Sequence, residues 1–129
     1  MNHILGIPDE VRYDAIPSVI YTTPEVASIG ETQESAEKKG LHVKVVRVPM
    51  TYSGRYVAET LNGSGFCKLV YDLDRRCLIG VQMVGSYVSE MICAASLMLN
   101  TELPLNQLRK IVFPHPTVSE VIREALFKL

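Results

Sequence analysis

The spacing of hydrophobic and polar residues changes along the chain, from a period of two in its first two-thirds to a period of 3.6 near its end. Short apolar or alternating runs at residues 16–21 and 41–49 predict β-strands. Two further runs, 66–71 and 77–84, are separated by the polar segment 72–76. We expect these two runs to pair as an antiparallel hairpin.

Two helices are expected around this hairpin. The first covers residues 32–39, with Thr32 as its N-cap and Gly40 closing it. The second covers residues 87–99, is started by Ser86, and is apolar nearly all round. A helix with so little polar face is buried on more than one side. In a domain of this size, the second cover could be another subunit.

The chain ends in helical segments. A short piece at 105–110 follows Pro104, and a last helix covers 118–127. Its apolar stripe comprises Val118, Val121, Ile122, Ala125, Leu126 and Leu129. The pattern predicts an α+β fold, a mainly antiparallel sheet packed with helices, over residues 16–129. Residues 1–15 are interpreted as a polar, irregular lead-in.

Composition and charge narrow the class of protein. The 129 residues are 47% apolar and 21% charged, with a formal net charge of −1. This balance is that of a globular domain and argues against nucleic acid or an anionic membrane as partner. No apolar run reaches the ~18 residues of a membrane span. The first residues lack a signal sequence, so we expect a cytoplasmic location.

The segment Phe113-Pro114-His115-Pro116 carries the candidate chemistry. Prolines on both sides restrict the backbone of His115, as is useful for a general base that must be pre-positioned. Glu120 lies in the first turn of the last helix and can fold back on His115 to hold one tautomer.

Simpler interpretations exist for both residues. Thr117-Val118-Ser119-Glu120 is also a capping box, with Thr117 at the N-cap and Glu120 at the third helical position. His115 can equally be an ordinary surface histidine in a loop. On residue chemistry alone these structural interpretations are favoured.

Other kinds of site lack their signatures. No Gly-x-Gly-x-x-Gly follows a strand, so the chain has no usual phosphate cradle for FAD or NAD. The three cysteines and three histidines show no metal-ligand spacing, and no metal site is expected. Cys67 and Cys77 are not expected to face each other across the hairpin, and Cys93 is interpreted as a small core residue.

Several segments in register resemble one family of enzymes. The His115-Pro116-Thr117-x-x-Glu120 run is similar to the C-terminal signature of dihydrolipoamide dehydrogenases and glutathione reductases. Residues 23–30, and 78–85 followed by 89–92, resemble that family's opening motif and its central strand and helix. The resemblance covers residues 13–129. It identifies the dimerisation domain of pyridine nucleotide-disulfide oxidoreductases, most like that of dihydrolipoamide dehydrogenase.

The resemblance implies a function for a larger protein. Two subunits pair through this domain, and His115 completes the partner subunit's active site as the base that takes a proton from dihydrolipoamide. Glu120 orients His115, and Pro116 lies near the partner's FAD, where a cis peptide is plausible. FAD and NAD belong to missing nucleotide-binding domains, and a further partner is the lipoyl-bearing acyltransferase of a 2-oxoacid dehydrogenase complex.

The chain also departs from the family pattern. The family's closely spaced redox cysteine pair is absent, so the isolated chain is expected to be inactive. The family often has Asn-x-Arg-Ala where this chain has Ser53-Gly54-Arg55-Tyr56, which leaves the local packing there open.

Three alternatives remain at this stage: the same domain of a glutathione-reductase-like enzyme, a stand-alone homodimerisation module without catalysis, and a small thiol protein using Cys67 or Cys77. The sequence leaves open the physiological thiol, the choice between NAD and NADP, whether Met1 is a natural start, and whether the isolated domain dimerises.

Overall fold

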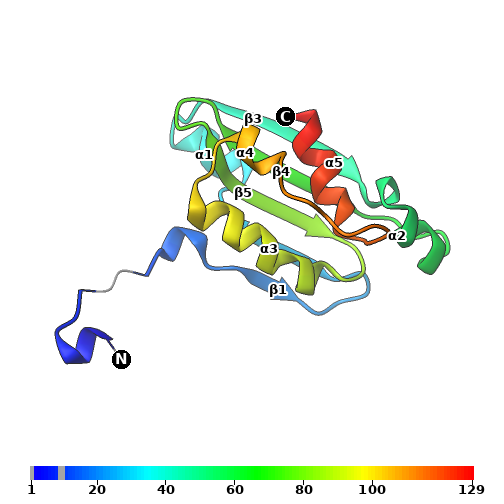
Figure 1. Cartoon of the computed structure of the whole chain (residues 1–129), viewed down its shortest axis with the longest axis horizontal. Helices are drawn as coiled ribbons and strands as arrows, with labels where there is room; N and C mark the ends of the chain where they lie inside the picture. The colour runs from blue at the N-terminus through cyan, green and yellow to red at the C-terminus, as the bar shows by residue number, and fades with distance from the viewer. Residues whose placement is uncertain (1, 9–10) are drawn as a thin grey trace.

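The computed structural model describes residues 2–8 and 11–129 and is built on one five-stranded sheet. The strands lie in the order β1-β2-β5-β4-β3, and all neighbours are antiparallel (Figure 1). Their bounds are Ser18–Ile20 for β1, Val26–Gly30 for β2, Val43–Pro49 for β3, Phe66–Asp72 for β4 and Cys77–Val84 for β5. The expected α+β fold with a mainly antiparallel sheet is confirmed.

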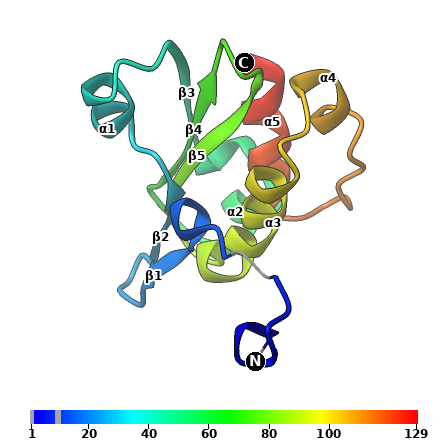
Figure 2. The same ribbon diagram turned by 90° about the vertical axis from the view of Figure 1, so that its left-hand side faces the viewer.

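Helices cover both faces of this sheet. The bounds are Gln33–Lys38 for α1, Gly54–Glu59 for α2, Val88–Thr101 for α3, Leu105–Leu108 for α4 and Glu120–Lys128 for α5. Helices α3 and α5 pack on one face and α1 lies on the other (Figure 2). The sequence pattern predicted no helix at α2, which is a short element between β3 and β4.

Alternation along β4 explains how the two faces are filled. Cys67, Leu69 and Tyr71 point into the main core beneath α3 and α5. Val70 points to the other face, where it packs with Ala36 of α1. A strand that buries alternate residues on both faces fits its position inside the sheet.

The β4–β5 hairpin forms as expected. The side chain of Asp72, only 2% exposed, accepts the backbone N–H groups of Asp74 and Arg75 at 2.9 Å and so closes the turn. In the register, Cys67 lies opposite Met83 and Cys77 opposite Asp72. The prediction that the two cysteines do not face each other is confirmed.

Helix α5 also matches its predicted pattern. All six members of its apolar stripe are buried in the main core, among them Ile122 and Leu126 at 0% exposure. The hydrophobic effect on this stripe seats α5 on β3 and β4. This placement fixes where the segment preceding α5 meets the body of the domain.

Helix α3 differs from its prediction at its start and on one face. It begins at Val88 after Tyr87, whose φ of 71° lies in the left-handed region, so the expected start at Ser86 is wrong. One face packs on β2 and β5. The opposite face leaves Leu97 64% exposed and Cys93 exposed. The interpretation of Cys93 as a core residue is therefore wrong, because it points away from the sheet.

Two glycines allow the chain that follows β2 to pass closely over β5. Gly30 pairs with Gly80 in the register and has a φ of +72°. The next residue, Glu31, donates its N–H to the Ile79 carbonyl at 2.8 Å, and Gln82 Nε2 donates to the Glu31 carbonyl at 2.9 Å. A Cβ on Gly80 would lie 1.8 Å from that Glu31 oxygen. The crossing therefore requires glycine at position 80.

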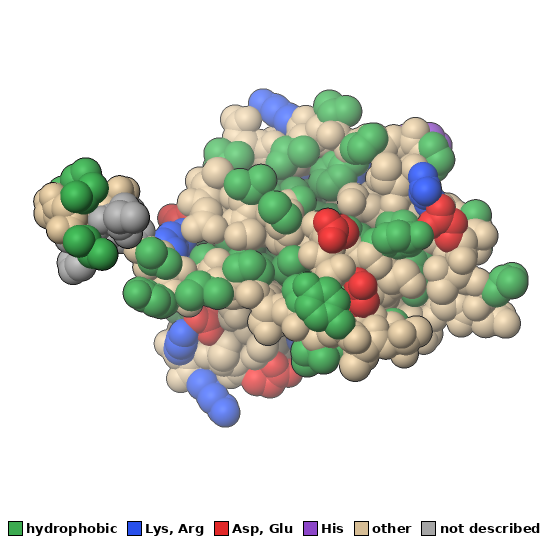
Figure 3. Space-filling model, turned by 90° about the horizontal axis from the view of Figure 1, so that it is seen from below, with side chains coloured by type: hydrophobic (Ala, Val, Ile, Leu, Met, Phe, Trp, Pro, Cys, Tyr) green, Lys and Arg blue, Asp and Glu red, His purple; other side chains and the backbone are tan. Residues whose placement is uncertain are grey.

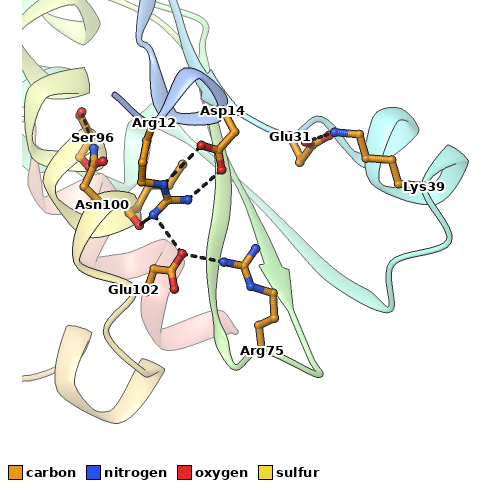
Figure 4. A network of polar contacts seen from close by, with 9 residues as sticks. Arg12, Asp14, Glu31, Lys39, Arg75, Ser96, Asn100 and Glu102 are labelled. Carbon is orange, nitrogen blue, oxygen red and sulfur yellow. Dashed lines mark hydrogen bonds and ion pairs between the residues drawn. The ribbon is translucent and has the colours of Figure 1, made fainter. Parts of the chain in front are cut away.

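The chain before β1 is partly tied to the domain. Arg12 pairs with Asp14 at 2.8 Å and with Glu102 at 2.9 Å, and it donates to the Leu99 carbonyl at 3.2 Å. Arg75 from the β4–β5 turn reaches the same Glu102 at 2.6 Å (Figure 4). A short 3₁₀ turn, η2 (Tyr13–Ala15), follows Arg12, whereas η1 (Asn2–Leu5) lies away from the sheet (Figure 1). The domain boundary at residue 15 stays a prediction.

Candidate functional site

The loop that joins α4 to α5 carries the candidate site. Pro114 and Pro116 restrict its backbone, and the His115–Pro116 peptide bond is cis. The loop is attached at both ends by apolar side chains: Phe113 packs against the main core and Val118 is 6% exposed. Between these anchors His115 points into solvent.

Within this loop His115 and Glu120 are in contact, as the sequence predicted. His115 Nδ1 lies 2.9 Å from Glu120 Oε1. The His115 side chain is 81% exposed, whereas that of Glu120 is 20% exposed. A carboxylate can only accept, so the neutral ring donates from Nδ1 and keeps Nε2 as a free acceptor. The contact therefore selects the tautomer in which Nε2 can take a proton.

The second carboxylate oxygen of Glu120 is also occupied. The backbone N–H of Thr117 donates to Glu120 Oε2 at 2.9 Å. This N–H, and then the hydrogen bond with His115, lower the pKa of Glu120 below its usual value. The carboxylate thus stays ionised at neutral pH while it holds the histidine ring.

Only half of the expected capping box forms. Glu120 accepts the Thr117 N–H, but the Thr117 hydroxyl donates to the Pro114 carbonyl at 2.7 Å. Helix α5 accordingly begins at Glu120 after Ser119, which makes no side-chain cap hydrogen bond. The prediction of Thr117 as N-cap, with the helix starting at Val118, is wrong. Glu120 instead serves both as an acceptor for the loop backbone and as the partner of His115.

His42 does not join this site. His42 forms its own exposed pair with Asp74, with Nδ1 3.1 Å from Oδ2. The side chain of His3 lies outside the described residues. Across the described part of the chain, no group of three or more His, Cys, Asp or Glu side chains is arranged to hold a metal ion. Nor does that part contain a helix long and apolar enough to cross a membrane.

Two of the cysteines are poor candidates for thiol chemistry. Burial raises the pKa of the Cys67 thiol to about 12 and also raises that of Cys77. A thiolate is the reactive form, and burial disfavours it at both positions in the folded chain. The alternative of a thiol protein using Cys67 or Cys77 loses its support.

An open pocket lies beside the loop and was not predicted. Its volume is about 280 Å³, and Thr117 to Ser119 form one wall. Tyr87 and Arg55 line another side, and both side chains contact Glu59, at 2.8 Å from the tyrosine hydroxyl and 2.6 Å from the guanidinium. No sequence pattern predicted this pocket, because its walls come from three regions that are far apart in the chain.

Comparison with known proteins identifies the family. The model of the pyridine nucleotide-disulphide oxidoreductase dimerisation domain matches residues 16–126. A dihydrolipoyl dehydrogenase of Thermus scotoductus is 43% identical over 111 residues, which are 85% of this chain and 24% of the relative. A mitochondrial dihydrolipoyl dehydrogenase of Caenorhabditis elegans is 35% identical over 95% of this chain and 24% of its own length.

Solved structures agree on the fold. LpdA from Mycobacterium tuberculosis superposes with a TM-score of 0.87 at 22% identity, over 98% of this chain and 28% of that protein. The HOCl-induced flavoprotein disulfide reductase RclA from Escherichia coli gives 0.84 at 24% identity, over 98% and 29%.

These matches also define what part of the relatives the chain represents. It spans 24% of the length of both dihydrolipoyl dehydrogenases compared above. The matched residues 16–126 include the five strands, helices α1 to α4, the His115–Glu120 loop and most of α5. The chain therefore belongs to the pyridine nucleotide-disulphide oxidoreductase family, of which it is a dimerisation domain, most like that of dihydrolipoamide dehydrogenase.

Proposed function

We propose that this chain is the interface domain of an FAD-dependent dihydrolipoamide dehydrogenase, which oxidises dihydrolipoamide with NAD. In this proposal the domain supplies the subunit contact and presents His115 as a base to the partner subunit's active site. Glu120 holds the ring, and Pro116 lies near the partner's flavin. The isolated chain has no activity of its own in this proposal.

The observation that carries the proposal is the paired, exposed histidine. Glu120 holds His115 Nδ1 at 2.9 Å, while 81% of the histidine side chain remains accessible. A base must reach a substrate proton, and thiol oxidation needs such a base because the thiolate is the nucleophile. A ring that is held at Nδ1 and exposed over most of its surface fits a residue that works in a neighbouring subunit.

The residues present fit a contact with FAD but not a complete binding site for FAD or NAD. FAD supplies the electron acceptor for a thiol substrate when it is bound. This chain has no Gly-x-Gly-x-x-Gly turn, and the pocket beside Thr117 has a volume of only about 280 Å³. Its residues therefore fit a contact with the edge of a flavin held elsewhere, through His115 and Pro116. They do not fit a binding site for the whole of FAD or NAD.

Self-association is proposed to use the uncovered face of α3. Leu97 is 64% exposed there, and an open apolar pocket between α3 and α4 continues this surface towards Ile111. Figure 3 shows hydrophobic side chains spread over the face of the molecule that carries α3 and β1. Exposed apolar side chains around an apolar pocket are typical of a surface that is buried in an assembled protein. We therefore infer a homodimer.

The wider setting follows from the same proposal. A lipoyl-bearing acyltransferase of a 2-oxoacid dehydrogenase complex is the proposed source of dihydrolipoamide. The missing FAD- and NAD-binding domains are the other partners, and the proposed location is the cytoplasm. The dihydrolipoyl dehydrogenase relatives support the choice of this substrate over glutathione.

Complementation tests this proposal against a stand-alone dimerisation module. The chain is mixed with a dihydrolipoyl dehydrogenase from which the interface domain has been deleted, and NADH formation from dihydrolipoamide and NAD is measured. The proposal predicts that turnover is restored in proportion to the amount of complex formed. A chain that dimerises tightly, and binds the truncated enzyme without restoring turnover, would favour the module without catalysis.

A further inference from the structure

We propose that Ser53 is a positioning residue for the catalytic loop: its buried hydroxyl fixes the carbonyl of Thr117, the residue whose N–H holds Glu120 against His115. The inference rests on the proposed role of His115, but its structural part can be tested separately. Nothing in the loop sequence itself points to Ser53, which lies 64 residues before Thr117.

Ser53 occupies a rigid position at the start of α2. Its side chain is the N-cap of this helix and accepts the backbone N–H of Tyr56 at 3.1 Å. The residue is 1% exposed. Tyr56 is also 1% exposed, and its hydroxyl donates to the Ser64 carbonyl at 3.1 Å. The start of α2 is therefore held by the core and not by the loop.

From this position Ser53 reaches the loop. Its Oγ donates to the Thr117 carbonyl at 2.9 Å. A hydroxyl has one proton, and here that proton goes to Thr117 while a lone pair accepts from Tyr56. The two contacts fix the direction of the hydroxyl. Because Ser53 is buried, water cannot readily replace either contact.

Thr117 connects Ser53 to His115 through hydrogen bonds with Glu120. Its N–H donates to Glu120 Oε2 at 2.9 Å, and Glu120 Oε1 lies 2.9 Å from His115 Nδ1. The Thr117 hydroxyl donates to Pro114 at 2.7 Å. These contacts of Thr117 with Glu120 and Pro114 join residues of the loop and the start of α5, whereas the Ser53 contact comes from another element. Ser53 therefore connects the hydrogen bonds around Thr117 to the buried start of α2.

Apolar contacts of the loop with the core would not orient the Thr117 backbone in the way that the Ser53 hydrogen bond does. Phe113 and Val118 hold the loop to the core by dispersion and burial, which are not directional. A carboxylate must present one oxygen to an N–H and the other to a ring nitrogen, which requires a defined orientation of the peptide. The Ser53 hydrogen bond supplies such an orientation at the residue that directly follows the His115–Pro116 pair.

The structural part is tested in the chain itself by NMR. Three variants are compared with the parent: Ser53→Ala, which removes the hydroxyl; Ser53→Thr, which keeps it; and Thr32→Ala, which removes the matched N-cap of α1. The two readouts are the titration of the Glu120 carboxyl group and the hydrogen exchange of the Thr117 amide. Amide shifts of β4 and β5 report whether each variant is folded.

The expected result is specific to Ser53. Ser53→Ala moves the pKa of Glu120 up toward its usual value, because the Thr117 N–H that lowers it is no longer held in place. It speeds exchange of the Thr117 amide about fivefold to tenfold, the change expected for the loss of one net hydrogen bond. Ser53→Thr restores both readouts, and Thr32→Ala changes neither.

The opposite result overturns the inference. If folded Ser53→Ala keeps the parental Glu120 titration and Thr117 exchange, Ser53 is only a helix cap. If Ser53→Ala does not fold, the comparison of Ser53→Thr with the parent decides: a folded threonine variant with altered readouts contradicts the proposal.

Kinetics of the complete enzyme separate this inference from the proposed function. Ser53→Ala is expected to lower kcat with little change in KM, and Ser53→Thr to recover it. If the NMR readouts change as expected but neither Ser53→Ala nor His115→Gln slows turnover, the positioning network stands and the role of His115 as base fails.

Discussion

The passage of the chain over β5 at Glu31, directly after β2, makes a quantitative prediction for Gly80→Ala. A Cβ at this position would lie 1.8 Å from the Glu31 carbonyl oxygen, whereas real Cβ contacts essentially never fall under 3.0 Å. The backbone of Glu31 must therefore move by at least 1.2 Å, the difference between these two distances. No flexible side chain can absorb this shift, because the obstructing atoms belong to the backbone.

The cost follows from what this shift disrupts. It breaks the Glu31 N–H to Ile79 hydrogen bond and the Gln82 to Glu31 hydrogen bond, each worth about 1 kcal/mol. Overpacking adds about 1–3 kcal/mol. We therefore expect Gly80→Ala to lower the free energy of unfolding by about 3–5 kcal/mol, a large share of the ~5–15 kcal/mol typical of a domain.

Equilibrium unfolding in urea, followed by circular dichroism, measures this loss. Gly54→Ala is the matched control: no atom lies within 4 Å of the added Cβ, and the position begins α2 with no positive φ. It is expected to stabilise the domain by about 0.4–1 kcal/mol. If the free energy of unfolding of Gly80→Ala is within about 0.5 kcal/mol of the parent value, the added Cβ does not displace the Glu31 backbone.

Three further predictions concern the core, the site and the thiols. Ile122→Ala is expected to lower the free energy of unfolding by about 2–5 kcal/mol, against less than about 0.5 kcal/mol for exposed Val112→Ala, both measured by urea unfolding. Because the pKa of Glu120 is lowered in the folded state, its contribution to stability is complete above pH 4.5, its usual pKa, and disappears as pH falls through the lowered pKa. The free energy of unfolding should therefore decrease less steeply with falling pH in Glu120→Gln than in the parent. Equal slopes in the two proteins would contradict this. Cys93 should react with a thiol reagent when the chain is dilute and become protected as the chain concentration rises. Cys67 should react only after unfolding. Rapid labelling of Cys67 in the native protein would contradict its burial.

Elements with local signals were predictable from the sequence. The β4–β5 hairpin was visible because two apolar runs flank a polar turn, and α5 because its stripe follows the helical period. Thr32 and Gly40 mark the ends of α1 by their capping chemistry, and both act as expected. In each case neighbours in the sequence determine the local conformation.

Features that depend on distant contacts were missed. Helix α2 has only six residues, and its start is fixed by the burial of Tyr56 in the core. Ser86 was expected to start α3, but the helix follows Tyr87, whose left-handed conformation is unusual for a bulky residue. Cys93 was assigned to the core because α3 is apolar nearly all round, but it lies on the exposed face of this helix.

The candidate site was predictable in part. The contact between His115 and Glu120 follows from their spacing and from the resemblance to the family. The choice between cap and orienting residue for Glu120 was not resolved by sequence, since its two oxygens serve both purposes. Ser53 was noted only as a departure from the family pattern, because its hydrogen bond to Thr117 depends on the tertiary fold.

Turnover of the complete enzyme with His115→Gln tests whether His115 acts as the base. The matched control is His42→Gln, which removes the other histidine–carboxylate pair of the described domain, formed with Asp74 at 3.1 Å. Oxidation of dihydrolipoamide by NAD is measured for both variants as dimers with full flavin content. We expect a loss of about 10²-fold or more for His115→Gln and none for His42→Gln. Equal, near-parental turnover of the two variants would contradict it.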